Sequence, residues 1–392
     1  MKNILHIDLN AFFYQCEANI RPELDKCNVA IGGDHRRGVL STCNYPARKK
    51  GIHSGMPSIT AKRVCPDLII LPGNYRLYSR VSHKFIDFLR GKFPILEQVS
   101  IDECYIDVTK YTSDETAHDF LIDLQLEIYK KLGLQCSMGY AHTKFLAKMA
   151  SDYKKPMGLT CIYTDEYKKY FWPLPISEMW GVGKKTAPRL EEAGIKTIGD
   201  LARIDPKDLK GLVGSHFQTY IEWANGIGSD RVVTVREERK SISNATTFEE
   251  DIDDVAILKE YLRKLTKEVV DGLVKHHQVT SKVVVQIRNS DFETHSKRGS
   301  IAGESDDFEE IYIAVLRVFL NFYKGQPVRL LGVGVEVSQN ESNFKQLNLF
   351  NSSKADNKIQ DKNNILDFLN KDESTKLFKT LGDIKVKKNE DK

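Results

Sequence analysis

The sequence predicts a multidomain protein of the α+β class, and three observations lead to this prediction. The chain has 392 residues, which is more than one ordinary hydrophobic core accommodates. Up to about residue 165, apolar runs with the length of strands alternate with amphipathic stretches that have helical spacing. A helical block interrupted by glycines follows, and residues 242–338 then show the order strand–helix–strand–strand–helix–strand.

The first 165 residues predict a sheet with helices on one face, because strands and helices alternate along the chain. Residues 3–9 form an apolar strand, and Phe12–Tyr14 an aromatic turn after it. Thr112 and Glu115 have the spacing of a capping box, which predicts a helix from there to about Leu132. The remaining strands are expected at 29–32, 38–44, 68–71, 136–141 and 159–163, with two more joined by a bend within 95–108, and the remaining helices at 45–51, 75–93 and 144–152.

The second half begins at a boundary marked by Pro173 and Pro175. Short helices separated by glycines continue to about Gly228, and a charged stretch then predicts a tether. In the unit that follows, two amphipathic helices are expected at 257–276 and 308–322, and strands at 282–288, 293–301 and 328–337. Residues 351–392 are rich in Lys, Asp and Asn, which predicts a mostly disordered tail with short partner-binding helices at 365–369 and 377–381.

The composition is typical of a soluble protein, with 41% hydrophobic and 29% charged residues. A net charge of +4 is compatible with a polyanionic partner but is weak support for one. The seven cysteines include no C-x-x-C pair, which argues against a disulfide framework and against a zinc ribbon. No apolar run is long enough to span a bilayer, and we expect a cytoplasmic protein.

Three carboxylates stand inside apolar runs. Asp102 and Glu103 are neighbours within residues 99–107, and Asp8 lies within residues 4–9. Neighbouring side chains of a flat strand point to opposite faces, so the chain is expected to bend at Asp102. Buried anions are unfavourable without a cation, and Mg²⁺ is a hard cation that prefers carboxylate oxygen. We therefore expect the three carboxylates to meet on adjacent strands and hold two metal ions, with a solvated acidic turn as the alternative.

Five motifs occur in one order along the chain: His6-Ile7-Asp8-Leu9-Asn10-Ala11-Phe12-Phe13, Asn44-Tyr45-Pro46-Ala47-Arg48, Ser100-Ile101-Asp102-Glu103, Lys144-Phe145-Leu146-Ala147-Lys148 and Lys154-Lys155-Pro156-Met157-Gly158. With this order and spacing the sequence resembles the Y-family DNA polymerases, and among them the DinB-like (DNA polymerase IV) branch. The resemblance covers residues 1 to about 340. It implies a right-hand polymerase with a palm (1–10 and 75–165), small fingers (11–74), an all-α helix-hairpin-helix thumb (166–230), a tether (231–241), a βαββαβ little finger (242–340) and a clamp-binding tail (341–392).

The resemblance also implies roles for the acidic residues. Asp8 and Asp102 would bridge two Mg²⁺ ions, Glu103 would hold the ion at the primer 3′-hydroxyl, and the carbonyl of Leu9 would complete the ion on the nucleotide side. Two metal ions shared by carboxylates activate the attacking hydroxyl and neutralise the leaving pyrophosphate in phosphoryl transfer.

The same resemblance implies a nucleotide site. Arg48 and Lys155 would bind the β- and γ-phosphate oxygens, with hydrogen bonds from Tyr45 and Thr42. Taken alone, Arg48 is more often a solvated helix residue, and Lys155 is more often a loop charge. Phe12 and Phe13 also belong to the nucleotide site that the resemblance implies. Phe12 has the character of a core residue, and Phe13 would be the steric gate that excludes ribonucleotides.

Two further segments suggest macromolecular partners. Gly181, Gly183 and Lys184 resemble the hairpin of a helix-hairpin-helix module, whose backbone N–H groups approach DNA phosphates, although a tight helix–helix turn is the alternative. In the last folded unit, the expected phosphate contacts are Lys282, Arg288, Lys297 and Arg298. The peptide Gln346, Leu347, Asn348, Leu349, Phe350 resembles a sliding-clamp-binding motif, although a terminal strand is the alternative.

These observations predict a monomeric, template-directed DNA polymerase that uses dNTPs and primer-template DNA. By resemblance it performs translesion synthesis with low fidelity and without proofreading. Two alternatives remain open: a UmuC-like mutagenesis polymerase that needs partner subunits, and a catalytically inactive scaffold that binds DNA and the clamp.

Overall fold

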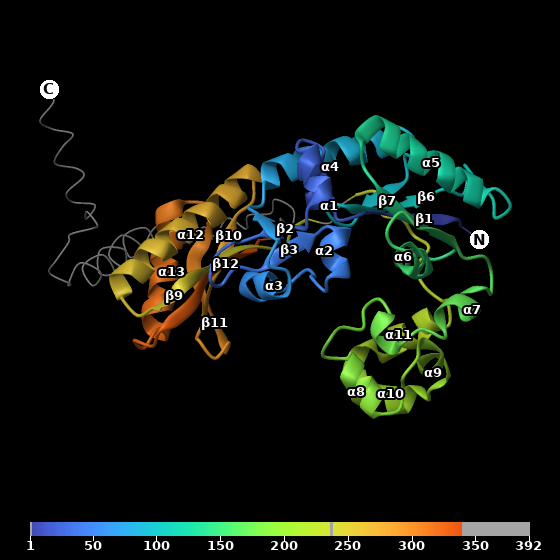
Figure 1. Ribbon diagram of the computed structural model, residues 1–392. Helices are drawn as coiled ribbons and strands as arrows, with labels where there is room; N and C mark the ends of the chain where they lie inside the picture. Colours follow the sequence, from blue (N-terminus) through green and yellow to red (C-terminus); the bar gives the residue numbers. More distant parts are fainter. Residues whose placement is uncertain (1, 236–237, 339–392) are drawn as a thin grey trace, which may run out of the picture. The chain divides into compact units, whose positions relative to one another are not determined.

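The computed structural model of this chain describes residues 2–235 and 238–338. The described residues form two compact units, 2–235 and 238–338, whose helices and strands are labelled in Figure 1. Among the described helices, none is both long enough and apolar enough to cross a membrane. The predicted clamp-binding peptide at 346–350 and the predicted tail helices at 365–369 and 377–381 lie outside the described residues.

A five-stranded mixed sheet forms the centre of the first unit, with the strand order β5-β6-β1-β7-β8. Strands β7 and β8 are parallel, and the other neighbours in the sheet are antiparallel. The strands confirm the predictions for this part of the chain: β1 (Ile4–Leu9), β5 (Leu96–Gln98), β6 (Glu103–Asp107), β7 (Cys136–Ala141) and β8 (Leu159–Cys161).

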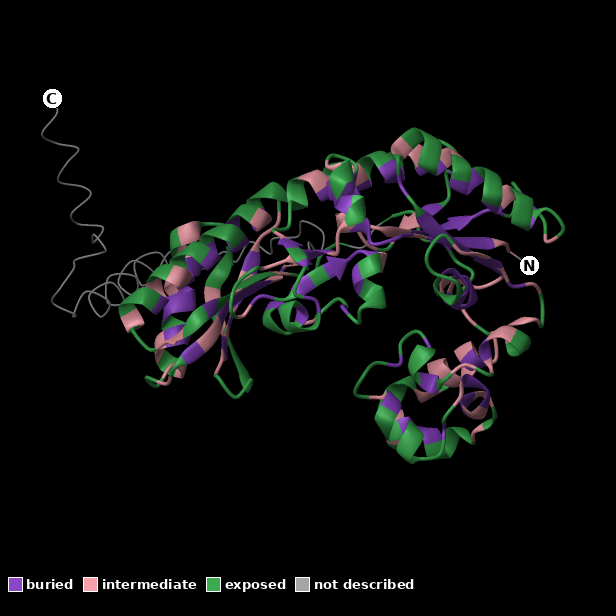
Figure 2. Cartoon of the chain, viewed as in Figure 1, coloured by how far each residue is buried: buried purple, intermediate pink, exposed green. Residues whose placement is uncertain are grey.

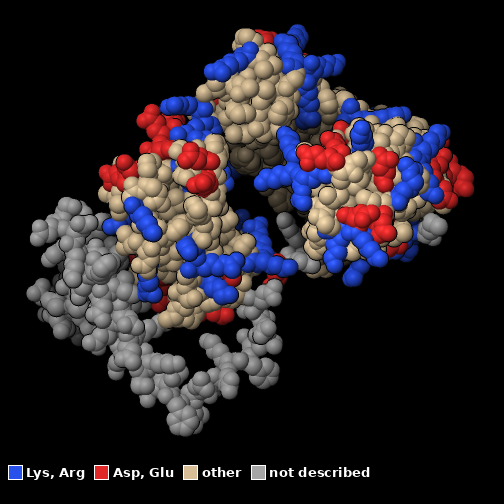
Figure 3. All heavy atoms as spheres, turned by 90° about the horizontal axis from the view of Figure 1, so that it is seen from below, with Lys and Arg blue, Asp and Glu red and all other residues tan. Residues whose placement is uncertain are grey.

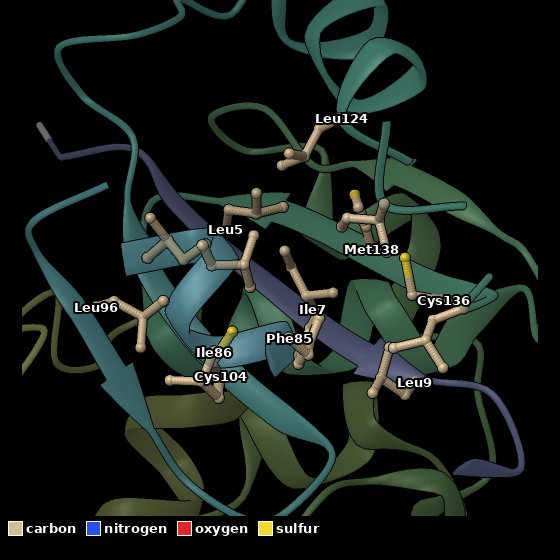
Figure 4. Packing of buried hydrophobic residues seen from close by; sticks show 14 of the residues in the cluster. Leu5, Ile7, Leu9, Phe85, Ile86, Leu96, Cys104, Leu124, Cys136 and Met138 are labelled. Atoms are coloured by element: carbon tan, nitrogen blue, oxygen red, sulfur yellow. The ribbon is translucent and has the colours of Figure 1, made fainter. Parts of the chain in front are cut away.

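Strand β1 separates an apolar core from a polar site, because its side chains alternate between the two faces of the sheet. Leu5, Ile7 and Leu9 belong to the largest core, which also includes buried residues of helices α4 (Tyr75–Arg90) and α5 (Ala117–Leu132) (Figure 4). His6 and Asp8 point to the other face, where they contact helix α6 (Lys144–Tyr153). The same strand thus packs the core and presents an acid.

The prediction that helices cover one face of this sheet is wrong. Helices α4 and α5 pack on one face, whereas α6 packs on the opposite face, against β1 and β7. Gly139 of β7 allows this close approach, because a Cβ atom there would overlap with backbone atoms of Ala147 and Ser151. Alternation of strands and helices in a sequence does not determine on which face a helix packs.

Two local predictions in this unit are also wrong. Phe12–Ala18 forms helix α1 instead of an aromatic turn, because Ala11 has a left-handed backbone (φ 45°) that lets the helix begin directly after β1. The proposed capping box does not form, since α5 begins after Thr116 and has no side-chain cap. Glu115 instead accepts a hydrogen bond from the Ser113 hydroxyl.

A second, smaller sheet lies within residues 29–71, with the strand order β3-β2-β4. Its strands were predicted, whereas helix α3 and the 3₁₀ helix η1 were missed because both are short and polar. The elements of this region are η1 (Pro22–Lys26), β2 (Val29–Gly32), β3 (Leu40–Cys43), α2 (Tyr45–Lys49), α3 (Ser58–Val64) and β4 (Ile69–Leu71).

The following block is all-helical, as predicted, and shares a hydrophobic core with α6. Phe145 of α6 stacks on Trp223 with a centroid distance of 5.1 Å, which ties the block to the sheet. The helices are α7 (Tyr167–Phe171), η2 (Ile176–Glu178), α8 (Ala187–Glu192), α9 (Ile198–Arg203), α10 (Pro206–Val213), η3 (Gly214–His216) and α11 (Phe217–Ala224).

The second unit confirms the predicted βαββαβ order. Its antiparallel sheet has the strand order β11-β10-β12-β9, and both helices contribute to one core on one face of the sheet. Figure 2 shows the resulting pattern, with buried positions on the inward sides of the helices and exposed positions on their outer sides. The elements are β9 (Ser241–Ile252), α12 (Val255–Lys275), β10 (Thr280–Arg288), β11 (Thr294–Ser305), α13 (Phe308–Phe322) and β12 (Val328–Val337).

Gly139→Ala tests the packing of α6 on the sheet. Because the added methyl group meets backbone atoms, we expect this substitution to lower the free energy of unfolding of the first unit by about 2 kcal/mol or more. Urea unfolding followed by tryptophan fluorescence measures it, since Trp172, Trp180 and Trp223 all lie in the first unit. Gly211→Ala is the matched control: nothing lies within 4 Å of a Cβ there, and a helix-interior alanine is expected to raise stability by about 0.5 kcal/mol. Equal effects of the two substitutions would contradict the packing argument.

Candidate active site

The sheet brings the three predicted carboxylates to one end. Asp8 and Glu103 are direct partners in the β1–β6 register. Asp102 lies in the turn between β5 and β6, and its carbonyl accepts a hydrogen bond of 3.0 Å from the backbone N–H of Leu9. The predicted bend is therefore present, and it separates the directions of the two neighbouring side chains.

The carboxylate of Asp102 is held by its own turn. The Ser100 hydroxyl donates a hydrogen bond of 2.5 Å to Oδ1 of Asp102. Burial raises the pKa of Asp102, and the nearby charges of Asp8 and Glu103 raise it further, against the opposing effect of the Ser100 hydrogen bond. Keeping this carboxylate ionised is thus unfavourable for the folded protein.

Two lysine ammonium groups neutralise the other carboxylates. Nζ of Lys148 lies 3.0 Å from Oδ2 of Asp8 and 2.8 Å from Oε2 of Glu103. Nζ of Lys155 lies 2.8 Å from the same Asp8 oxygen and 2.7 Å from Oδ1 of Asp152. Burial lowers the pKa of Lys148, but the charges of Asp8, Asp152 and Glu103 outweigh burial and raise it above the ordinary value. Within residues 2–235 and 238–338, no three His, Cys, Asp or Glu side chains are placed to hold a metal ion as they stand.

His6 completes the cluster from inside the sheet. Its side chain is fully buried, and Nδ1 is hydrogen-bonded to Oγ of Ser151 at 2.8 Å. Nε2 lies 3.4 Å from Oε2 of Glu103 but, among the described residues, makes no hydrogen bond. Burial lowers the pKa of His6, although Glu103 opposes this effect.

A polar cavity of about 260 Å³ opens beside Asp8 and Asp102. It brings together the residues that the resemblance assigned to nucleotide binding, from β1, α1, β3, α2 and the loop after α6. Its lining residues are Asp8, Leu9, Asn10, Ala11, Phe12, Phe13, Ser41, Thr42, Tyr45, Arg48, Ser54, Asp102 and Lys155. The Arg48 guanidinium is held by the carbonyl of Cys43 at 3.1 Å and lies over the Tyr45 ring at 5.1 Å.

The two neighbouring phenylalanines differ in exposure. Phe12 is 2% exposed and belongs to the core. Phe13 is half-buried, lines the polar cavity, and stacks on the Tyr78 ring with a centroid distance of 4.4 Å and an angle of 13°. The Phe13 ring is thereby fixed at the cavity wall.

A second cavity of about 330 Å³, which we call the aromatic cavity, lies beside Glu103. Aromatic side chains from the sheet, from α6 and from the helical block form much of its wall. Its lining residues are His6, Glu97, Val99, Glu103, Tyr105, Lys144, Phe145, Lys148, Trp180, Trp223 and Ser229. Nζ of Lys144 lies 2.7 Å from both carboxylate oxygens of Glu97 at its edge.

The predicted hairpin of the helical block contains a glycine with a left-handed backbone. Gly181 has φ 92°, a backbone conformation that favours glycine, and a Cβ there would lie 3.0 Å from the Trp223 ring. Glycine therefore suits both the backbone conformation and the close contact with the ring. Gly183 faces open space. Lys184 is exposed, as a phosphate contact requires.

The basic residues predicted in the second unit lie on two faces of its sheet. Lys282 and Arg288 face away from the helices, because Val283 and Ile287 next to them belong to the core. Arg298 lies on the same side, because its cross-strand partner is Val284. Lys297 is the cross-strand partner of the core residue Val285, so it lies on the helix side. Figure 3 shows Lys and Arg side chains interspersed with Asp and Glu over the face drawn, so the excess positive charge is not gathered in one patch there.

Sequence reasoning missed three residues of the cluster. Lys148 is the last residue of the motif at 144–148 and forms ion pairs with Asp8 and Glu103. Asp152 forms ion pairs with both Lys148 and Lys155. Their spacing on α6 (i, i+4) was a usable signal, because these positions share one helix face. His6 gave no such signal, since only the fold shows that its side chain is buried beside Glu103.

Three family models match the chain. Residues 7–152 match the impB/mucB/samB family, residues 239–349 match its C-terminal domain, and residues 164–195 match the HHH motif of the same family. DNA polymerase IV 1 of Bacillus subtilis (strain 168) is 38% identical over 382 residues, which is 96% of this chain and 92% of that protein. DNA polymerase IV of Listeria monocytogenes serotype 4a (strain HCC23) is 37% identical over 85% of this chain and 94% of its own length.

A solved Y-family DNA polymerase chimera of Dbh and Dpo4 has a similar structure, with a TM-score of 0.76, 26% identity, and coverage of 85% of this chain and 98% of the chimera. The chain belongs to the Y family of DNA polymerases. Dbh DNA polymerase in an insertion ternary complex is also similar, with a TM-score of 0.60, 25% identity, and coverage of 86% of this chain and 98% of that chain. The α+β fold and the helix-hairpin-helix block of this Y-family polymerase agree with the predicted fold class.

Asp102→Asn tests whether the buried negative charge of Asp102 lowers the stability of the folded protein. Because the pKa of Asp102 is raised in the folded state, its ionised form opposes folding above that pKa, and the effect disappears as the pH falls toward the ordinary value of 3.8. We expect the substitution to raise the free energy of unfolding at neutral pH, and to lose this gain in acid. Urea unfolding followed by tryptophan fluorescence measures both.

Asp107→Asn is the contrasting control. This carboxylate accepts hydrogen bonds from N and Oγ1 of Thr109 at 3.1 and 2.6 Å, so its replacement should lower stability. A loss of stability for Asp102→Asn at neutral pH would show that the Asp102 charge is not strained.

Proposed function

We propose that this Y-family polymerase is a translesion DNA polymerase that adds dNMP to the 3′-hydroxyl of a primer under direction of a template. The observation that carries this proposal is the polar cavity, which Asp8 and Asp102 line together with Arg48, Lys155, Tyr45 and Thr42. A cavity lined by both acidic and cationic groups suits a triphosphate that must be held by its oxygens while the reaction takes place at one end.

We further propose that Asp8, Asp102, Glu103 and the Leu9 carbonyl hold two Mg²⁺ ions. This donor set consists only of oxygen atoms, which is the ligand chemistry that Mg²⁺ prefers. Lys148 and Lys155 already supply positive charge to Asp8 and Glu103, so the carboxylates occupy a position that requires cations. When bound, the ions supply charge neutralisation to the attacking and leaving oxygens.

The residues of the chain itself bind and orient the substrates. The Arg48 guanidinium is fixed by Cys43 and Tyr45 and is thereby oriented to bind phosphate oxygens in a forked contact. Lys155 is a point charge that exchanges its contact with Asp8 for a phosphate oxygen. Ser100 orients the carboxylate of Asp102, and Phe13 closes the cavity beneath the sugar.

The proposal extends to partners and to fidelity. The small segment 11–74 would enclose the nascent base pair loosely, which suits damaged templates, low fidelity and the lack of proofreading. Gly181, Gly183 and Lys184, together with Lys282, Arg288, Lys297 and Arg298, would contact DNA phosphates. Residues 346–350 would bind a sliding clamp, and the protein would act as a monomer in the cytoplasm. The division into palm, fingers, thumb, tether and little finger at the predicted boundaries belongs to the same proposal.

Asp102→Ala tests the proposed chemistry. We expect loss of primer extension by at least a thousandfold in the presence of Mg²⁺, because the substitution removes a carboxylate that would hold the ions, while affinity for primer-template DNA is retained. Gel-based extension and fluorescence anisotropy measure the two properties. Asp119→Ala, an exposed acid on α5, is the control and should extend normally.

Three outcomes separate the alternatives. Extension by the purified wild-type protein alone contradicts a requirement for UmuC-like partner subunits. A wild-type protein that binds DNA but does not extend a primer is the inactive scaffold. Equal extension by wild type and Asp102→Ala would remove the proposed mechanism.

Phe13→Ala tests sugar selection. Removing the ring opens space under the sugar, and we expect the preference for deoxyribonucleotides over ribonucleotides to fall by about a hundredfold or more, as loss of a steric clash worth several kcal/mol implies. Single-nucleotide insertion kinetics with each nucleotide measure the ratio of kcat/KM values. Tyr129→Ala, an exposed aromatic on α5 that does not line the polar cavity, should leave the ratio unchanged. An unchanged ratio for Phe13→Ala would assign the gate elsewhere.

A further inference from the structure

Strand β11, the outer strand of the sheet in the second unit, has a free edge. It is the last strand in the order β11-β10-β12-β9, and its residues 294–300 pair with residues 282–288 of β10 without a register shift. On its other side, no backbone hydrogen bond joins β11 to any described residue. A free edge presents a row of unpaired N–H and C=O groups, which is a template for pairing with another extended chain.

A groove of about 650 Å³ lies beside β11 on the side of the helices, against the second half of α13. The side chains of β11 alternate between the two faces of the sheet. Lys297 faces the groove, because its cross-strand partner is the core residue Val285. Gly299 faces the same way, and a Cβ there would overlap with the side chain of Val318. No side chain of β11 therefore fills the groove at this position.

The groove is lined by cationic side chains and by no acidic one. Lys297, Arg317 and Lys324 are exposed, and none of the three forms an ion pair within residues 2–235 and 238–338. By contrast, Arg298 faces the open side of the sheet and pairs with Glu336 at 3.0 Å. Like charges without acidic partners around one groove produce a positive potential that attracts an anionic partner.

Charged side chains on an edge strand commonly prevent pairing with other chains. At β11 this protection is selective, because the charges that line the groove have one sign. A basic strand is repelled, and so is the β11 strand of a second copy, whereas an acidic strand is attracted. Val318 and Phe322 add apolar surface to the wall of the groove.

We propose that β11 binds an acidic, extended segment of a partner protein, which adds a fifth strand to the sheet and places its carboxylates in the groove. Main-chain hydrogen bonds to the free edge supply affinity, and the groove supplies specificity. Side chains of an added strand recur on one face at every second residue, so acids at alternate positions lie beside Lys297, Arg317 and Lys324. A nucleic acid also has negative charge, but it has no backbone N–H and C=O groups that match a strand edge.

This inference goes beyond the proposed polymerase function and does not use the acidic cluster. It changes one assignment, which concerns Lys297. Lys282 and Arg288 face away from the helices, whereas Lys297 lies on the helix side. A duplex bound to the open face of the sheet therefore contacts the opposite side from Lys297, and we assign Lys297 to the protein partner.

Synthetic peptides test charge and strand addition separately. Three fluorescein-labelled peptides of about ten residues, the length of a long strand, alternate Thr with Glu, Thr with Gln, or Pro with Glu. Fluorescence anisotropy with the full-length protein at low salt measures their Kd values. We expect the Thr-Glu peptide to bind about tenfold more tightly than either other peptide, because Gln removes the charge and Pro removes backbone N–H groups. Equal Kd values for the Thr-Glu peptide and either other peptide would overturn the proposal.

Charge reversal tests whether the groove is the binding site. Lys297→Glu combined with Arg317→Glu should abolish the preference for the Thr-Glu peptide over the Thr-Gln peptide. Lys264→Glu combined with Lys275→Glu is the matched control, because both lysines are exposed on α12 outside the groove and the net charge changes by the same amount. The control should retain the preference. Equal losses in the two double variants would show that overall charge attracts the peptide, and would contradict the assignment to the groove.

Hydrogen exchange tests whether the peptide adds as a strand at β11. We expect the Thr-Glu peptide to slow amide exchange in β11 and to leave β9 unchanged. Strand β9 is the internal control, because it is the other edge of the same sheet. Slower exchange in β9 alone, or no change in either strand, would refute strand addition at β11. Exchange in β11 of the free protein as slow as in the inner strand β10 would show that the chain itself covers this edge, which also refutes the proposal.

An oligothymidylate of about ten nucleotides tests the other class of anion, since single strands of this length bind cationic grooves. We expect Lys297→Glu with Arg317→Glu to weaken its binding no more than the control double variant does. If the oligothymidylate binds more tightly than the Thr-Glu peptide, and only the groove variant weakens this binding, the groove is a nucleic-acid site and the peptide proposal is wrong.

Discussion

The pairing of Asp8 with Glu103 across β1 and β6 is the constraint on which the site depends. Two carboxylates that face each other in adjacent strands repel unless positive charge lies between them. Lys148 and Lys155 supply that charge from α6 and the loop after it. Helix α6 must therefore pack on the polar face of the sheet, and Gly139 permits the close approach. Ion pairs between these lysines and carboxylates therefore position α6 on this face, in addition to hydrophobic packing.

The opposite face of the same sheet packs against the core formed with α4 and α5. Leu5, Ile7 and Leu9 are at most 2% exposed and pack with α4 and α5. Because a strand alternates its side chains, Leu5, Ile7 and Leu9 pack this core, whereas His6 and Asp8 face the site and Ile4 packs on the site side in the core shared by α6 and the helical block. The buried and partly buried acids then stand on rigid backbone, which keeps the distances between them small and reproducible.

The two cavities beside the acidic cluster differ in chemistry, so the two sides of the site are not equivalent. The polar cavity has oxygen and nitrogen groups that suit a triphosphate, whereas the aromatic cavity has rings and one buried imidazole. Neighbouring residues Asp102 and Glu103 line different cavities because the chain bends between the turn and β6. A single bend therefore places these two neighbouring carboxylates beside different cavities.

How much of this was predictable depends on whether the information was local. The apolar runs and their acids predicted the strands at 3–9 and 136–141 and the bend at Asp102, and hydrophobic periodicity predicted the βαββαβ order of the second unit, because these patterns are carried by neighbouring residues. The group of residues at the polar cavity was predicted only through the resemblance to the Y-family polymerases. The face on which α6 packs, the helix at Phe12, the failed capping box, the lysine pairing at Asp8 and the position of His6 were decided only by the tertiary structure. Each of these depends on contacts between residues far apart in the chain, or on a single left-handed residue such as Ala11, and no local pattern of side chains specifies them.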